Sequence, residues 1–357
     1  MNKSIVLISN IFPDLSNPAA GTFVANIADN LKNEGWFVEY ITMENGPGKR
    51  GGLSYVYFTL KVFLSIIKNK DKIFYVHYIS HSSLGVVLAG LLGFRRKIVL
   101  NAHGSDVIKE DTVSNARFFL KKSIVKLALR YMTLLVLPST YYKELICEKY
   151  SLKKDKCIVS PSGGISLQRF SKGKHQNRNS PFTLGFVGRL TEDKGTKDFL
   201  TLLEKFKSDR VEFKAIIVGS GPLSGLVSEF CSVNNNVEYY PLATGKDLVS
   251  IYQLLDVFVF PTKRVTESLG LVGIEAMACG VPVVVYRGSG PETYVSEGYN
   301  GFKVESGSVE ELYKKCLFLS ALSKDGKEKL SEQCLDTSRK YDSAIAGKEL
   351  SRVFSSM

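Results

Sequence analysis

The chain alternates short apolar runs with longer amphipathic segments along most of its length. Runs such as Val257–Phe260, which Pro261 closes, are rich in valine and phenylalanine and are typical of buried parallel strands. Longer segments such as 115–132 and 195–207 predict helices. Strands that alternate with helices in this way indicate βαβ units, and a series of such units predicts a doubly wound parallel sheet of the α/β class.

This alternating pattern occurs twice, on either side of a polar stretch without apolar periodicity, whose composition is typical of a linker. We therefore expect a first Rossmann-like domain over residues 1–170, a linker over 171–180 and a second Rossmann-like domain over 181–335. The remaining segment, 336–357, predicts a helix with polar residues on several faces.

One βαβ unit of the second domain carries two glutamates in an apolar context, within the sequence TESLGLVGIEAMACGVPVVVY at 266–286. The pattern predicts a helix over 269–279 and a strand over 281–285, so Glu267 falls at the mouth of the helix and Glu275 about two turns deeper. Ligands of doubly wound sheets bind at the carboxyl ends of strands and at helix N-termini, where both carboxylates could meet one ligand. The alternative is a glutamate that favours the helix dipole and a second one on the helix surface.

Composition and charge narrow the class of protein. Hydrophobic residues make up 44% and charged residues 23%, as in globular proteins, and no apolar run reaches the ~18 residues of a membrane span. The N-terminus lacks the pattern of a signal peptide, and six scattered cysteines without a Cys-x-x-Cys pair indicate reduced thiols in a cytoplasm.

The net charge of +12 is unevenly distributed. Residues 1–180 contain 26 Lys and Arg and 12 Asp and Glu, so the excess positive charge lies in the first half of the chain. Such a surface favours an anionic partner, which could be nucleic acid, an acidic membrane face or a phosphorylated acceptor. The segment 116–132 places Lys121, Lys122, Lys126 and Arg130 beside Phe, Leu and Ile, which fits a membrane-facing helix or a core helix with a solvated basic side.

Four loops that follow predicted strands carry candidate chemistry. They contain His103 with Gly104 and Asp106, Arg189 and Lys194 after Gly188, the pair Gly219 and Gly221, and the two glutamates. Arginine and lysine neutralise phosphates, carboxylates accept from ribose and sugar hydroxyls, and histidine can donate to a hydroxyl. Each residue also has a structural alternative: a satisfied loop histidine, an N-cap for Asp106, turn glycines and surface charges.

Taken together, these loops resemble those of the GT-B retaining glycosyltransferases of family 4, in an order that covers nearly the whole chain. The matching segments are His-Gly-x-Asp at 103–106, SPSGGISLQRF at 160–170, VGRLTEDKG at 187–195, VGSGPL at 218–223 and Glu-x7-Glu at 267–275. The resemblance implies a GT-B fold, two doubly wound Rossmann-like domains that face a central cleft, with the last helix crossing back to the first domain.

The resemblance also implies roles for the matching positions, all toward a nucleoside diphosphate sugar, with UDP as the expected nucleotide. Arg189 and Lys194 would hold the diphosphate, Glu275 the ribose, and His103 would lie beside the transferred sugar. Glu267 would bind the donor sugar together with the backbone of a short run. The other donor-binding positions are Gly188, Gly219, Gly221, Leu242 (through its backbone, toward the base), Ser268, Leu269, Gly270 and Leu271.

On the acceptor side the match is less close, because the sequence AAGTF contains Gly21 alone where these enzymes often have a Gly-Gly loop. We expect Gly21, Thr22 and Asp106 to bind the acceptor. No Asp-x-Asp occurs in the chain, so we expect no metal and no cofactor besides the nucleotide-sugar co-substrate.

The resulting hypothesis is a retaining, metal-independent hexosyltransferase in polysaccharide or glycan assembly. It would act at the inner face of the membrane as a peripheral cytoplasmic protein, on a polyprenyl-diphosphate-linked saccharide, with an anionic membrane surface and no nucleic acid as its partner. The alternatives are a nucleotide-sugar epimerase or hydrolase on the same fold, and a non-catalytic subunit that binds sugars or a partner enzyme.

Overall fold

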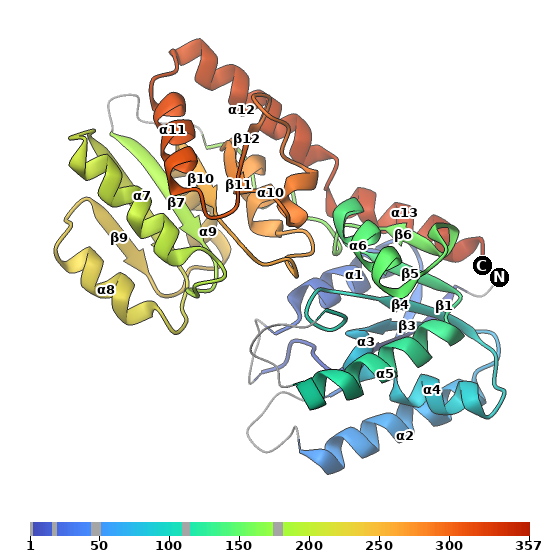
Figure 1. The fold of residues 1–357 in the computed structure, drawn as a ribbon. Helices are drawn as coiled ribbons and strands as arrows, with labels where there is room; N and C mark the ends of the chain where they lie inside the picture. The colour runs from blue at the N-terminus through green and yellow to red at the C-terminus, as the bar shows by residue number, and fades with distance from the viewer. Residues whose placement is uncertain (1–2, 16–19, 44–50, 109–114, 174–180) are drawn as a thin grey trace. The chain divides into compact units, whose positions relative to one another are not determined.

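A computed structural model describes residues 3–15, 20–43, 51–108, 115–173 and 181–357, with only the backbone for 115–118. The chain forms two compact units (Figure 1), residues 1–164 with 343–357, and residues 165–342. Residues 165–170, which the sequence analysis assigns to the first domain, therefore belong to the second unit. Residues 174–180 of the expected linker lie outside the described residues.

The first unit is built on a parallel six-stranded sheet in the order β2-β1-β3-β4-β5-β6. The four inner strands, β1, β3, β4 and β5, are apolar runs that are buried along most of their length, as expected for a sheet covered on both faces, whereas the edge strands β2 and β6 are partly exposed. Their bounds are Ser4–Ser9 (β1), Phe37–Thr42 (β2), Ile73–His77 (β3), Lys97–Asn101 (β4), Leu134–Leu137 (β5) and Cys157–Val159 (β6).

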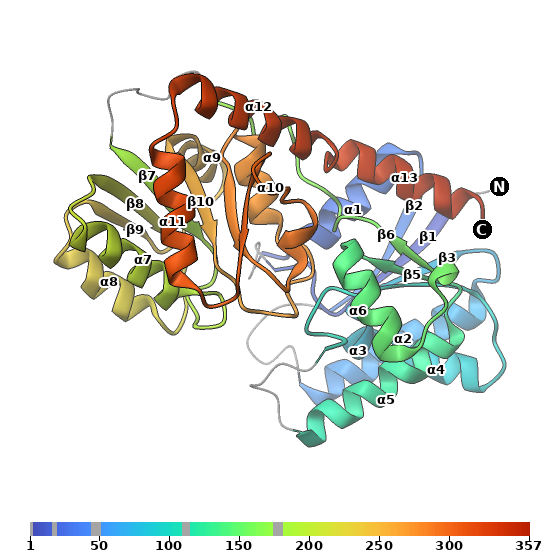
Figure 2. The ribbon, with the colours of Figure 1, turned by 45° about the horizontal axis from the view of Figure 1, so that its top comes forward.

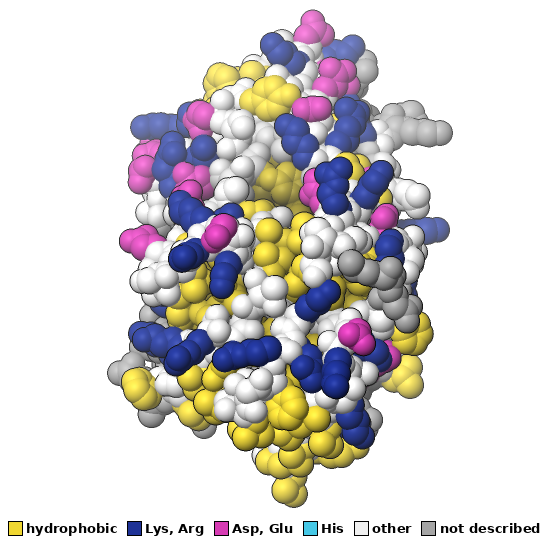
Figure 3. Space-filling view, turned by 90° about the vertical axis from the view of Figure 1, so that its right-hand side faces the viewer, with side chains coloured by type: hydrophobic (Ala, Val, Ile, Leu, Met, Phe, Trp, Pro, Cys, Tyr) yellow, Lys and Arg dark blue, Asp and Glu magenta, His cyan; other side chains and the backbone are white. Residues whose placement is uncertain are grey.

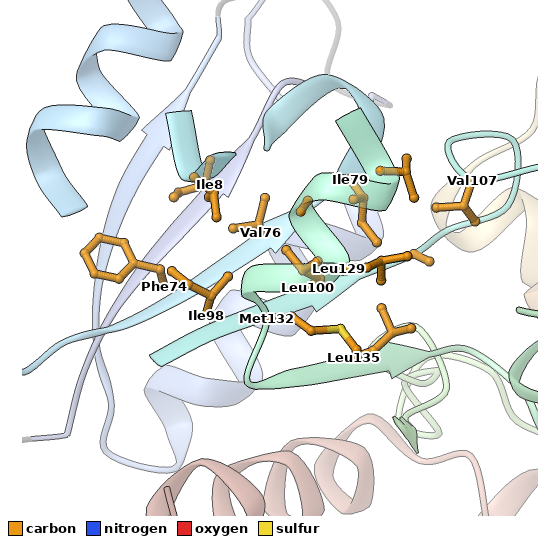
Figure 4. Packing of buried hydrophobic residues seen from close by; sticks show 14 of the residues in the cluster. Ile8, Phe74, Val76, Ile79, Ile98, Leu100, Val107, Leu129, Met132 and Leu135 are labelled. Carbon is orange, nitrogen blue, oxygen red and sulfur yellow. The ribbon is translucent and has the colours of Figure 1, made fainter. Parts of the chain in front are cut away.

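Helices cover both faces of this sheet (Figures 1 and 2). One core cluster joins alternate strand residues to helices α2, α3, α4, α5 and α6, and Figure 4 shows part of it. The opposite strand residues pack against α1 and α13. The helix bounds are Thr22–Asn33 (α1), Gly52–Lys68 (α2), Ile79–Ser82 (α3), Leu84–Leu91 (α4), Asn115–Tyr131 (α5), Thr140–Tyr150 (α6) and Ser343–Ser355 (α13).

The last helix, α13, is part of the first unit because specific side chains fix it there. Nε1 of Trp36 donates a hydrogen bond to Oγ of Ser351 at 2.9 Å, and the Trp36 ring meets Phe354 edge-on at 5.9 Å. A Cβ on Gly347 would lie 2.8 Å from Cβ of Asn30, so glycine permits close packing on α1.

The second unit repeats the architecture, with a parallel sheet in the order β12-β11-β10-β7-β8-β9. The strands are Phe182–Val187 (β7), Phe213–Val218 (β8), Val237–Tyr240 (β9), Val257–Phe260 (β10), Val283–Tyr286 (β11) and Gly301–Val304 (β12). The helices are Thr196–Ser208 (α7), Ser224–Ser232 (α8), Gly245–Leu254 (α9), Leu271–Ala278 (α10), Val309–Ser320 (α11) and Lys324–Arg339 (α12). Core clusters lie on both faces, one with α7 and α11 and the other with α9 and α10.

The α/β doubly wound prediction is correct for both units, but several local predictions need correction. The pattern missed α6, whose N-cap Ser139 accepts from the Tyr142 amide at 3.1 Å, and it missed β12 and α11. The apolar segment after β3 forms two short helices, α3 and α4, where its composition alone would suggest one. The helix expected over 269–279 begins later, at Leu271, because Gly270 has a left-handed φ of +77° and ends the preceding loop.

Candidate functional site

The candidate site of the second unit lies where the strand order of its sheet reverses. Strands β7 and β10 are neighbours, although β8 and β9 lie between them in the sequence, and their carboxyl ends lie at the same edge of the sheet. The loop after β7 carries Gly188, Arg189 and Lys194, and the loop after β10 carries Glu267. Such switch points are where doubly wound sheets bind ligands.

Close backbone packing shapes the loops at this edge. Gly219, after β8, has φ of +133°, and a Cβ there would lie 1.9 Å from the carbonyl oxygen of Gly188. A Cβ on Gly221 would lie 2.5 Å from the carbonyl oxygen of Leu190. These glycines therefore allow the two loops to pack against each other, which is a structural role in addition to any role in binding.

Direct contacts also hold the loops after β7 and β10 together. The Lys263 amide donates to the carbonyl oxygen of Asp193 at 2.8 Å, and Nε of Arg264 lies 3.2 Å from Oδ2 of Asp193. The Gly290 amide donates to the carbonyl oxygen of Glu267 at 2.7 Å. The backbone that carries Glu267 is thus fixed on two sides.

Lys194 and Glu267 form an ion pair across these loops, and each side chain is only 15% exposed. The Lys194 ammonium also lies 5.6 Å from the centre of the Phe260 ring. Two charges at this depth require compensation, and here each compensates the other. The lysine predicted for phosphate and the glutamate predicted for sugar therefore share one place in the structure.

The start of α10 lies directly after this pair. Gly270 is its N-cap, Leu269 is buried, and Ser268 and Leu271 are partly exposed. Tyr294 fixes the turn by donating from its hydroxyl to the Gly270 carbonyl at 2.9 Å. The first amides of a helix have no partner within the helix, so this end offers donors for an anion beside Lys194.

Glu275 is the fifth residue of α10. It therefore lies about one turn into the helix and not two, because the helix begins at Leu271. Its Oε2 accepts a hydrogen bond from the hydroxyl of the buried Tyr252 at 3.1 Å. Burial raises the pKa of Glu275 to about 6, while Tyr252 and Arg169 oppose that shift.

Two further residues that the sequence predicts for donor binding lie apart from this cluster of contacts. Arg189 is exposed, and its guanidinium forms no hydrogen bond or ion pair within the described parts of the chain. Leu242 is 77% exposed in the loop between β9 and α9. Both side chains are accessible, whereas Lys194 and Glu267 are already paired.

In the first unit, His103 follows β4 and lies beside a second histidine. Nε2 of His103 and Nδ1 of His77 are 3.0 Å apart, and the rings stack with an interplanar angle of 9°. Phe23 and Tyr78 pack on His103 at centroid distances of 4.6 and 4.9 Å. Burial lowers the pKa of His103 to about 3 and that of His77 well below its usual value, so the pair is neutral at physiological pH.

His77 is the residue that the sequence analysis missed. It ends β3, lies next to Asn101 of β4 in register, and is completely buried. Its Nε2 is buried and has no hydrogen-bond partner among the described residues. The sequence did contain one signal for it, because His77 ends the apolar run that comes directly before the apolar run preceding His103.

Asp106 supports the turn that contains His103. Its Oδ1 accepts from the amides of His103 and Gly104 at 2.9 and 3.0 Å, and its Oδ2 accepts from the Ile79 amide at 2.9 Å. Burial raises the pKa of Asp106 to about 6, and the backbone amides oppose this. These contacts favour the structural alternative for Asp106, and acceptor binding by this residue stays a prediction.

Gly21 and Thr22 start α1. Gly21 is its N-cap with φ of +67°, and a Cβ there would lie 2.8 Å from the carbonyl oxygen of Ile11. Thr22 is exposed. Because β1 and β3 are neighbours in the first sheet, the loop before α1 and the His77 region both follow strands at that sheet's own switch point.

Two kinds of feature are absent from the described residues. Nowhere in the described ranges do three His, Cys, Asp or Glu side chains gather in a way that could hold a metal ion. No helix in those ranges combines the length and hydrophobicity needed to cross a bilayer. Metal independence itself stays a prediction.

Residues 168–340, almost all of the second unit, match the family model described as Glycosyl transferases group 1. The chain is 27% identical over 247 residues to the capsular polysaccharide biosynthesis glycosyltransferase CapM of Staphylococcus aureus, which covers 65% of this chain and 64% of that protein. It is also 27% identical over 352 residues to the uncharacterized glycosyltransferase MJ1178 of Methanocaldococcus jannaschii, with 91% and 93% covered.

Solved structures extend the likeness to the whole fold. Sucrose-phosphate synthase from Thermosynechococcus elongatus has a TM-score of 0.77 at 18% identity and covers 99% of this chain and 98% of its own. Anabaena Alr3699/HepE in complex with UDP and glucose has a TM-score of 0.72 at 18% identity, with both chains fully covered. At these identities the likeness shows the fold alone, and the predicted GT-B fold is confirmed.

The paired Lys194 and the accessible Arg189 give a first prediction. Arg189→Ala and Lys194→Ala should each lower kcat for sugar transfer about a hundredfold, equivalent to ~3 kcal/mol. Each change removes a positive charge that would stabilise the negative charge developing on the leaving diphosphate. Steady-state kinetics measure the loss, and Lys197→Ala, at a nearby exposed ion pair with Glu192, is the matched control. Near-normal kcat in both site variants would refute the assignment.

Glu275 gives a pH prediction. Its pKa of about 6 means that the carboxylate is ionised above pH 6 and takes up a proton as the pH falls below it. If the carboxylate accepts from ribose hydroxyls, affinity for UDP should weaken as pH falls through 6. Calorimetry from pH 5 to 8 should show a smaller pH dependence for Glu275→Gln, and the titration of UDP itself cancels in the comparison. Parallel pH profiles would contradict this role.

Proposed function

We propose that this chain, a group 1 glycosyl transferase by its residues 168–340, moves a sugar from UDP to a saccharide acceptor with retention of configuration. The observation that carries the proposal is the Lys194–Glu267 ion pair at the switch point of the second sheet, beside the start of α10. A cation, a carboxylate and free helix amides together fit the phosphates and hydroxyls of a nucleotide sugar.

The donor would bind by replacing the internal ion pair. A diphosphate that enters beside α10 offers Lys194 a stronger negative partner, and Arg189 is accessible to add a second positive charge. Glu267 would then accept hydrogen bonds from the sugar hydroxyls, and Glu275 from the ribose. The backbone near Leu242 would meet the base.

In the transfer step, the bond between the sugar and the diphosphate breaks while the acceptor oxygen bonds to the same face of the sugar. The leaving phosphate takes the acceptor's proton, and Arg189, Lys194 and the helix start stabilise its growing charge. A neutral His103 would donate a hydrogen bond to the transferred sugar, which its low pKa permits because a neutral imidazole still has one N–H group. This scheme uses fixed cations in place of a metal ion.

For the acceptor we propose a saccharide linked to a polyprenyl diphosphate at the inner face of a membrane. The similarity to a capsular polysaccharide glycosyltransferase supports a role in polysaccharide assembly. The basic first half of the chain supports an anionic, membrane-borne acceptor, with the protein acting as a peripheral cytoplasmic enzyme.

A screen of UDP- and GDP-sugars against a lipid-linked acceptor, read by mass spectrometry, tests this proposal. The acceptor should gain one hexose mass with a UDP-sugar, UDP should be released only with acceptor present, and activity should persist in EDTA. A new UDP-sugar without acceptor would indicate an epimerase, and UDP binding without turnover on any acceptor would indicate a non-catalytic subunit. Loss of activity in EDTA that Mg²⁺ restores would overturn the metal-free scheme.

A further inference from the structure

Helix α2 carries an apolar stripe on each of two faces. Phe58, Val62 and Ile66 are buried in the core of the first unit. Leu53, Val56, Tyr57, Leu60 and Leu64 are exposed, and Leu53 reaches 87%. Their spacing of three and four residues places them along one side of the helix, opposite to the core. An ordinary surface helix has polar residues there.

Helix α4 repeats this arrangement directly beside α2. Leu84, Leu88, Leu91 and Leu92 are exposed, with Leu92 at 66%, while Val86 and Val87 are buried in the same core cluster as α2. The two helices are in close contact, because a Cβ on Gly85 would lie 2.7 Å from the carbonyl oxygen of Thr59. The two outward stripes therefore form one continuous surface, which we call the leucine face.

The charged side chains of the helices that form and flank the leucine face are all basic. The sequences of α2, α4 and α5 contain no Asp or Glu. Lys61 and Lys68 of α2 are exposed, as are Arg95 after α4 and Lys126 and Arg130 of α5. In Figure 3, hydrophobic and basic side chains predominate over acidic ones in the lower part of that view. Helix α5, next to α4 in the same core cluster, adds the exposed Phe119 and Leu120.

We propose that the leucine face inserts into the headgroup region of an anionic lipid bilayer. Exposed leucines with lysines at their margin have the composition of a membrane-surface helix, in which the apolar side chains enter the acyl boundary and the cations meet the anionic headgroups. A second copy of the chain is the poorer occupant, because a two-fold interface would place the same positive charges opposite each other. Nucleic acid would leave the leucines in water.

This inference rests on the proposed function, which places the saccharide acceptor in a membrane. It extends the interpretation of segment 116–132 as a membrane-facing helix. That segment predicts electrostatic attachment through α5, which salt should abolish. The structure instead assigns the apolar contact to α2 and α4, which should leave a salt-resistant part of the binding. The two contributions can be separated by experiment.

Cosedimentation of the full chain with phosphatidylcholine vesicles, with and without about 30% of the anionic lipid phosphatidylglycerol, tests the proposal. Wild type should bind the anionic vesicles, with a part that persists at high salt. The combined variant Leu60→Ser, Leu64→Ser, Leu88→Ser and Leu91→Ser should weaken binding at least about tenfold at low salt and remove the salt-resistant part. The combined variant Lys121→Glu, Lys122→Glu and Lys126→Glu should weaken mainly the salt-sensitive part.

The matched control is Leu226→Ser with Leu254→Ser, two exposed leucines on the second unit, which should bind vesicles as wild type does. Leu60→Trp gives an independent readout, because insertion should shift the indole emission to shorter wavelength, while the chain's one tryptophan, Trp36, is buried. Wild type that ignores anionic vesicles, or a serine variant that binds as tightly as wild type, would overturn the inference. UDP calorimetry on the same samples separates this outcome from failure of the proposed function, since only the latter abolishes UDP binding in wild type.

Discussion

Parallel strand pairing is the constraint on which both units depend. Each sheet pairs its strands in parallel only, so the carboxyl ends of its strands gather at a single edge. The loops that follow neighbouring strands therefore lie beside each other. In the second unit this brings Lys194 and Glu267, which are 73 residues apart in the sequence, into one ion pair. In the first unit it brings together His77 and His103 from adjacent strands.

The polar pairs at the carboxyl edges of the two sheets compensate for burial in different ways. Lys194 and Glu267 keep opposite charges that cancel, and an incoming phosphate can exchange with the carboxylate at modest cost because a compensating charge is always present. The histidines instead lose their charge, since burial lowers both pKa values and one shared hydrogen satisfies the facing nitrogens. A charged phosphate partner suits the first arrangement, and a neutral hydroxyl partner suits the second.

The sequence predicted the alternating architecture because strand and helix periodicities are local properties of the chain. It also located the two glutamates, since the Gly270 cap and the apolar run around Ile274 determine where α10 lies. It missed His77, whose importance appears only when β3 and β4 pair. It also predicted Asp106 among the acceptor ligands but could not show that the carboxylate accepts from three amides, those of His103 and Gly104 in its own turn and that of Ile79 at the start of α3. Likewise, exposed leucines on α2 look like core residues until the fold shows that another stripe already fills the core.

A crystal structure of the protein with bound UDP would test the central claim most directly. The account predicts diphosphate oxygens within hydrogen-bond distance of Nζ of Lys194 and of the first amides of α10, with a ribose hydroxyl on Glu275 and the Lys194–Glu267 pair opened. A nucleotide bound away from the loops after β7 and β10, or a diphosphate that leaves this ion pair intact and untouched, would contradict it.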